Sequence, residues 1–167
     1  MDILVIGGGG REHAIIRKIK ESPLCGKVYC APGNGGIAAD AECIPSVKAT
    51  DVEGAVRLAQ EKKLGFVIVA PDDPLVPGMV DALEAAGIPA FGPRKNAAIL
   101  EGSKAFAKDL MRKYGIPTAA YEIFTDAEAA IAYVRAQNAY PTVIKADGLA
   151  LGKGVIIAQS EQEAVTA

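Results

Sequence analysis

The sequence predicts an α/β fold whose first part is an open parallel sheet with helices on both faces. Short apolar runs alternate with longer segments in which apolar residues recur at helical spacing. Glycine-rich loops follow the first two runs, as expected where strands buried on both faces come to an end. Alternation of this kind favours parallel strands, because each helix carries the chain back to the end of the sheet where the next strand begins.

Residues 1–92 supply the alternating elements of this sheet. Thr50 or Asp51 is suited to cap the second helix, and Gly87 to end the third. We therefore expect strands at 3–6, 28–31, 66–69 and 90–91, and helices at 14–19, 51–63 and 80–86.

The pattern changes after residue 92. Two consecutive helices are expected there, and the second should end at Gly115, because glycine followed by a proline such as Pro117 is typical of a helix end. We divide the chain into a first unit (1–92), a helical connector (93–119) and the start of a second unit (120–167). The helix beginning at 161–165 is expected to continue in a longer natural protein. The later elements are helices at 94–100, 103–114 and 127–137, an apolar segment at 121–124, and strands at 142–145 and 155–158.

Composition excludes several classes of function. The 167 residues carry 18 Lys and Arg against 20 Asp and Glu, a net charge of −2 that argues against nucleic-acid binding. Half of the residues are hydrophobic, so the chain is not disordered. No apolar run is long enough to cross a bilayer, and the start is too short and acidic for a signal peptide. Three cysteines and one histidine match no metal motif, so we expect reduced thiols in a cytoplasmic protein. For the oligomeric state, a monomer is favoured.

The first glycine-rich loop, residues 7–10, joins the first strand to the first helix. A helix start offers backbone N–H groups and a partial positive charge, which suit a phosphate, and Arg11 could add a bidentate contact. A dinucleotide fold is disfavoured, because Glu12 and His13 stand where its third glycine would be needed and no acidic residue ends the second strand. The alternative is a tight turn without a ligand.

His13 is the only histidine of the chain. At a helix start beside Arg11 and Glu12 it could assist an anion or accept a proton near neutral pH. It could also be a polar packing residue, and the pattern leaves these roles open.

The second glycine-rich loop, residues 147–154, lies between two expected strands and should form the tip of a hairpin. It lacks the glycine at 153 and the following helix that a Walker loop needs, and Lys145 precedes the glycines whereas a kinase lysine follows them. Such a hairpin can fold over a triphosphate, with Lys145 reaching the phosphoryl oxygens. The alternative is a flexible surface hairpin with a solvated Lys153, although Leu149 and Leu151 are unusually apolar for one.

Several blocks of residues occur in one order along essentially the whole chain. They are 5–13, 31–34, 74–76, 91–93, 100–106, 143–150 and 152–155. In these blocks the chain resembles the glycinamide ribonucleotide synthetases, members of the ATP-grasp superfamily. The resemblance implies a Rossmann-like, pre-ATP-grasp domain followed by the beginning of an ATP-grasp domain.

The resemblance also implies an activity. This family of carbon–nitrogen ligases joins glycine to phosphoribosylamine in purine synthesis, with ATP and Mg²⁺ (or Mn²⁺). ATP phosphorylates the glycine carboxylate, and the amine then attacks the glycyl phosphate. By resemblance the chain covers somewhat under half of such an enzyme, and the metal ligands lie beyond it. We therefore expect no metal-binding residue here and no activity of the chain alone.

The family's functional residues correspond to positions in and near the two glycine-rich loops and to a few positions elsewhere in the chain. Asp72 stands where the family usually has Glu, so a substrate hydroxyl contact there is expected to be longer or water-mediated. The implied catalytic residues are Lys145 and His13. The implied substrate-binding residues are Gly8, Gly9, Gly10, Arg11, Glu12, Asn34 and Asp72, and the implied ATP-binding residues are Lys104, Lys145, Gly148, Gly152, Lys153 and Gly154.

Two other functions stay open at this point. One is another ATP-grasp ligase with a similar leading domain, such as a carboxylase of purine synthesis. The other is a non-catalytic module that binds a phosphate ligand. Residues 11–13 and 102–106 favour the glycine ligase.

Overall fold

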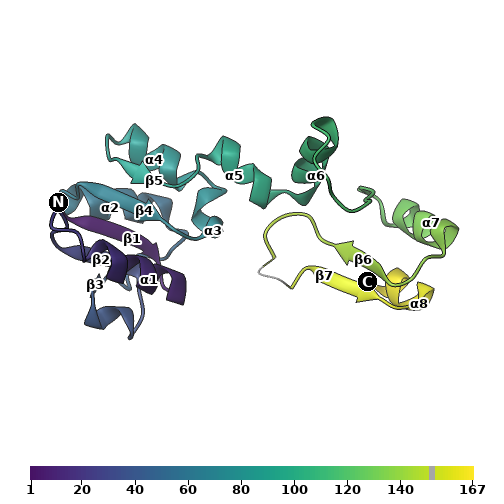
Figure 1. Cartoon of the computed structure of the whole chain (residues 1–167), viewed down its shortest axis with the longest axis horizontal. Coiled ribbons are helices and arrows are strands. Elements are labelled where there is room, and N and C mark those ends of the chain that lie inside the picture. Colours follow the sequence, from purple (N-terminus) through teal and green to yellow (C-terminus); the bar gives the residue numbers. More distant parts are fainter. Residues whose placement is uncertain (151–152) are drawn as a thin grey trace. The chain divides into compact units, whose positions relative to one another are not determined.

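The computed structural model describes residues 1–150 and 153–167. The chain forms two compact units, Met1–Ile99 and Leu100–Ala167, each described here by itself (Figure 1). The boundary falls within α5 (Lys95–Gly102). The division of the chain at residues 92 and 119 stays a prediction.

The first unit is built on an all-parallel sheet, as the sequence predicts, with five strands where four were expected. Its strands are β1 (Ile3–Gly7), β2 (Val28–Pro32), β3 (Glu42–Cys43), β4 (Phe66–Val69) and β5 (Ala90–Phe91), in the order β3-β2-β1-β4-β5. The two-residue β3 was not expected, because it is too short to produce an apolar period. The carboxyl ends of β2, β1 and β4 lie next to one another, so the loops that follow these strands are neighbours.

Helices cover both faces of this sheet. Asp51 caps α2 by accepting the N–H of Gly54 at 2.8 Å, which selects it over Thr50 as the cap. The segment expected as a loop at 70–74 contains a helical turn, α3, because Pro74 can occupy the first turn of a helix without a lost hydrogen bond. The helical elements are α1 (Gly10–Ile19), η1 (Ile37–Ala39), α2 (Val52–Glu61), α3 (Asp72–Leu75) and α4 (Met79–Ala85).

Alternate residues of β1 face opposite layers of the core. Leu4 and Ile6 pack in one buried cluster with residues of α2 and α4, and Val5 packs in another with Ile16 of α1 and Ile37 of η1. The side chains of Leu4, Val5, Ile6, Ile16 and Ile37 are all fully buried. The central strand therefore holds the loop after Gly7 in a fixed place at the edge of the sheet.

The second unit contains α6 (Lys104–Lys113), α7 (Ala127–Gln137), a hairpin of β6 (Thr142–Lys145) and β7 (Val155–Ala158), and α8 (Glu161–Thr166). The strands are antiparallel, with Lys145 opposite Val155. The apolar segment 121–124 has no regular structure. Val143, Ile156 and Ile157 of the hairpin are exposed. Among the described residues, no helix is both long and apolar enough to span a membrane.

Candidate functional site

The first glycine-rich loop is shaped around a buried carboxylate. Glu12 is only 5% exposed and accepts the N–H of Gly9 at 2.5 Å. A Cβ at Gly7, where φ is +123°, would lie 2.6 Å from Cγ of Glu12. Glycine is therefore required at position 7, and the buried Glu12 side chain stabilises the loop through its hydrogen bond with Gly9. Its predicted contact with a substrate stays a prediction.

The loop after β2 is fastened to the loop after β1. Asn34 donates from Nδ2 to the carbonyl of Gly8 at 2.6 Å, and its Oδ1 accepts the N–H of Ile37 at 2.9 Å. Gly33 donates its N–H to the carbonyl of Gly7 at 3.1 Å. A Cβ at Gly8 would stand 2.8 Å from the carbonyl oxygen of Gly33, so glycine is needed for this close approach. The structure thus brings together Asn34 and Gly8, two of the substrate-binding residues that the resemblance implies.

Arg11 connects the first loop to the loop after β4. Its Nη1 donates to the carbonyl of Ala70 at 3.1 Å, and Asp72 begins α3 two residues later. Gly9, Gly10 and Arg11 are exposed, and the first N–H groups of a helix have no partner within it. The carboxyl edge of β2, β1 and β4 therefore presents free amide donors, one guanidinium and one side-chain amide, a set suited to a phosphorylated ligand.

His13 has a partner that sequence reasoning missed. Its Nε2 lies 2.8 Å from Oδ2 of Asp40, while Oδ1 of Asp40 accepts from Lys20 Nζ at 3.1 Å. The hydrogen bond from His13, followed by that from Lys20, lowers the pKa of Asp40 below its usual range. No local pattern pointed to Asp40, because it lies 27 residues from His13 and follows a short 3₁₀ turn.

The second unit has a polar cluster at the start of α6. Ser103 caps α6 by accepting the N–H of Phe106 at 3.1 Å and donates its hydroxyl to Asp147 at 3.0 Å. Asp147 also accepts the backbone N–H of Lys104 at 2.6 Å and that of Ala105 at 3.2 Å. The bond from Ala105 is the main cause of the lowered pKa of Asp147. Asp147 was not among the predicted site residues, although it begins the second glycine-rich loop.

Two of the predicted ATP-binding residues, Lys104 and Gly148, adjoin this cluster. Lys104 Nζ donates to the carbonyl of Gly148 at 2.5 Å, so these two predicted residues are in contact. Lys145 ends β6 with an exposed side chain, and Lys153 is exposed on the other arm of the hairpin. A Cβ at Gly154 would lie 2.7 Å from that of Ala150, which explains the need for glycine there. Gly152 and Leu151 lie outside the described residues.

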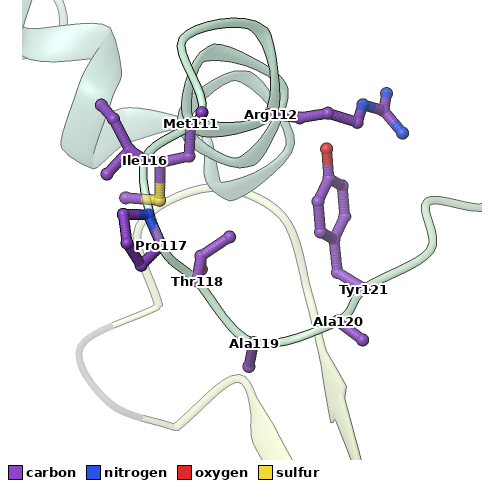
Figure 2. Close-up of a pocket in the computed structure, with 9 residues that line it drawn as sticks. Met111, Arg112, Ile116, Pro117, Thr118, Ala119, Ala120 and Tyr121 are labelled. Carbon is purple, nitrogen blue, oxygen red and sulfur yellow. The ribbon is translucent and has the colours of Figure 1, made fainter.

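A cavity of about 430 Å³ lies elsewhere in this unit, between the end of α6 and the segment that follows it (Figure 2). Figure 2 shows the Tyr121 ring beside Arg112, whose guanidinium carbon is 5.2 Å from the ring centre. Of the predicted ATP-binding residues that the structure describes, none lines this cavity. Within residues 1–150 and 153–167, no group of three or more His, Cys, Asp or Glu side chains could hold a metal ion.

Comparison with known proteins identifies the family. The family model described as phosphoribosylglycinamide synthetase, N domain, matches residues 1–101, more than half of the chain. The chain belongs to the phosphoribosylglycinamide synthetase family. The model of this family's ATP-grasp (A) domain matches residues 102–167. The resemblance found in the sequence is thereby confirmed, as is the order of a parallel α/β domain and the beginning of an ATP-grasp domain.

Curated relatives of this chain are named phosphoribosylamine–glycine ligase. The relative from Yersinia pestis is 54% identical and that from Agrobacterium fabrum 55% identical, each across 100% of this chain. Both alignments cover 39% of the relative. The chain thus spans about two fifths of the length of the curated relatives it matches.

Solved structures of similar proteins agree. The phosphoribosylamine–glycine ligase of Thermotoga maritima has a TM-score of 0.76 and 32% identity, over 99% of this chain and 38% of that one. The biotin carboxylase domain of the Hydrogenobacter thermophilus 2-oxoglutarate carboxylase, solved with MgADP, has a TM-score of 0.77 and 24% identity, over 99% of this chain and 39% of that one. This second likeness shows that the chain shares its fold with that biotin carboxylase domain.

Proposed function

We propose that the chain forms the amine-binding domain and part of the ATP-binding domain of a cytoplasmic, monomeric ligase that joins glycine to 5-phosphoribosylamine. The observation that carries this proposal is the carboxyl edge of β2, β1 and β4. There Arg11 donates to the carbonyl of Ala70, and Asn34 donates to the carbonyl of Gly8. These contacts occur in a chain of the phosphoribosylglycinamide synthetase family.

The amine substrate is proposed to bind at this edge through its phosphate. The backbone N–H groups of Gly10 and Arg11 open α1 with the positive end of the helix dipole, which stabilises a dianion. Glu12 already accepts the N–H of Gly9, so this amide is expected to shape the loop instead of binding the ligand. Asn34 and Asp72 are the polar side chains available for the ribose hydroxyls. His13 is proposed to act on the amine.

ATP is proposed to bind at the hairpin of the second unit. Lys104 and Lys145 supply two cations, and residues 148–154 supply the cover over the phosphates. Cations at a transferring phosphoryl group stabilise the charge of the transition state, and a cover that excludes water protects an acyl phosphate from hydrolysis. Ligases of this class use ATP together with Mg²⁺ or Mn²⁺. The described residues include no group of three or more His, Cys, Asp or Glu side chains that could hold such an ion.

The proposed reaction has two steps. The glycine carboxylate attacks the terminal phosphoryl group of ATP, which gives glycyl phosphate and ADP. The amine of phosphoribosylamine then attacks the acyl carbon, phosphate leaves, and the nitrogen gives up a proton. Lys104 and Lys145 would hold the phosphoryl oxygens in the first step, and the edge of β2, β1 and β4 would hold the amine substrate for the second.

The test is an assay of ADP release by a protein that carries this chain and has the full length of its relatives. ADP formation that requires both glycine and phosphoribosylamine is expected. ADP formation that requires bicarbonate in place of glycine would instead favour a carboxylase. The 167-residue chain alone is expected to release no ADP under the same conditions.

A further inference from the structure

The histidine–aspartate pair in the first unit fixes which nitrogen of His13 carries a proton. Oδ2 of Asp40 lies 2.8 Å from Nε2 of His13, and Oδ1 accepts from Lys20 at 3.1 Å. Each carboxylate oxygen thus has one partner, so the side chain is held from both sides. The pKa of Asp40 is lowered, first by the bond to His13 and then by that to Lys20, so the group is a carboxylate at neutral pH. A carboxylate only accepts, and therefore Nε2 must be the donor.

The other ring nitrogen faces the loop after β2. In a neutral imidazole with a proton on Nε2, Nδ1 is an acceptor. A Cβ built on Gly36 would lie 3.6 Å from Nδ1 of His13 and 3.2 Å from Oδ1 of Asn34. Nδ1 is therefore next to the segment that carries Asn34. Within residues 1–150 and 153–167, the bond to Asp40 is the one side-chain hydrogen bond of His13.

We infer that Asp40 is a positioning residue that holds His13 with its proton on Nε2, so that Nδ1 can accept the proton released by the amine of the substrate. This inference rests on the proposed function. As the carbon–nitrogen bond forms and the carbon–oxygen bond to phosphate breaks, the nitrogen loses one proton, and Nδ1 takes it. The resulting imidazolium is stabilised by the Asp40 carboxylate, in the way a buried or half-buried carboxylate orients a histidine base in other enzymes. His13 then acts as a base, which decides between the two roles left open by the sequence.

The protonation state of His13 can be observed directly in the 167-residue chain. His13 is its only histidine, so the imidazole signals in a long-range ¹H–¹⁵N spectrum need no assignment. At a pH where the ring is neutral, we expect the proton on Nε2, exchanging slowly with water. In Asp40→Ala the Nε2 proton should exchange fast and the share of the Nδ1–H form should rise. Lys20→Met, which leaves the contact between Asp40 and His13, should keep the wild-type signals.

Two results would overturn the inference. One is an Nδ1–H form in the wild-type chain. The other is an imidazole spectrum of Asp40→Ala that matches the wild type. If Asp40→Ala does not fold, Asp40→Asn replaces it, because the amide retains one acceptor oxygen but no charge; its Nε2 proton should then exchange faster than that of the wild type.

A kinetic measurement on the full-length ligase completes the test. Asp40→Ala should lower kcat by about tenfold or more, a part of what a general base contributes, and Asp40→Glu should restore part of it. The KM for ATP should not change. Unchanged kcat would exclude Asp40 from the reaction. If no ligase activity is found with the wild type, the proposed function fails, whereas the spectrum still reports on the pair.

Discussion

The carboxylate of Asp147 accepts the backbone N–H of Lys104 at 2.6 Å, across 43 residues of sequence. With the bonds from Ala105 and Ser103, it ties the end of β6 to the first turn of α6. In the same turn of α6, the Lys104 ammonium donates a hydrogen bond to the carbonyl of Gly148. One carboxylate therefore positions both a predicted nucleotide-binding lysine and the start of the second glycine-rich loop.

Replacement of Asp147 should destabilise the second unit. Asp147→Ala leaves the N–H groups of Lys104 and Ala105 without their acceptor, and a lost helix cap costs about 1 kcal/mol. Asp126→Ala is the matched control, because Asp126 caps α7 through the N–H of Ala129 alone. Thermal unfolding should show a larger drop in Tm for Asp147→Ala. Equal drops would mean that the link between α6 and the hairpin adds nothing to stability.

Loss of the strand lysine should weaken nucleotide use in the full-length ligase. Lys145→Ala removes a cation from the end of β6. A phosphate contact that is stronger in the transition state than in bound ATP lowers kcat as well as raising KM when it is lost. We expect a lower kcat and a higher KM for ATP, with the KM for glycine less affected. Steady-state kinetics with Lys48→Ala, an exposed lysine of the first unit, provide the control. Wild-type kinetics for Lys145→Ala would remove this lysine from its proposed role.

Acid should weaken the contacts of both aspartates. The folded-state pKa values of Asp40 and Asp147 lie below the unfolded value of about 3.9. Their stabilisation is thus present above that value and is lost as the pH falls through the lower, folded-state pKa. Tm measured from neutral pH down to about pH 3 should fall less steeply for the double variant Asp40→Asn, Asp147→Asn than for the wild type. Parallel curves would contradict this linkage.

The three cysteines should differ in reactivity. Cys30 is fully buried, and burial is the main cause that raises its pKa to about 12, so it remains a thiol at neutral pH. Cys25 and Cys43 are partly exposed. Mass spectrometry after treatment with an alkylating reagent should find two modified cysteines in the folded chain and three after unfolding in denaturant. Modification of Cys30 in the folded chain would contradict its burial.

Much of this fold is readable from local patterns. The apolar runs that lead up to Gly7 and Pro32 predicted two inner strands of the sheet, because buried parallel strands are continuously apolar. The two glycine-rich loops marked the strand ends. In contrast, β3 is too short to leave a pattern, and α3 begins with residues that are equally common in turns.

The partners of the site residues were harder to predict. No local pattern showed that the Glu12 side chain is buried under the loop, where the missing side chains of Gly7 and Gly9 leave room for it, and its contact with a substrate stays a prediction. Asp40 and Asp147 contact residues 27 and 43 positions away. Such contacts depend on the tertiary fold, which brings together segments whose local sequences carry no sign of one another.

The central claim is that the edge formed by β2, β1 and β4 binds a ribose phosphate, and the most direct measurement is the Tm of the 167-residue chain with ribose 5-phosphate. At a concentration 100 times its Kd, the ligand should raise Tm by roughly 10 °C, while ribose without phosphate should have little effect. Arg11→Met should reduce the shift, and Arg17→Met, at the far end of α1, should not. No shift of the wild-type Tm at saturating ribose 5-phosphate, or equal shifts with ribose, would contradict the claim.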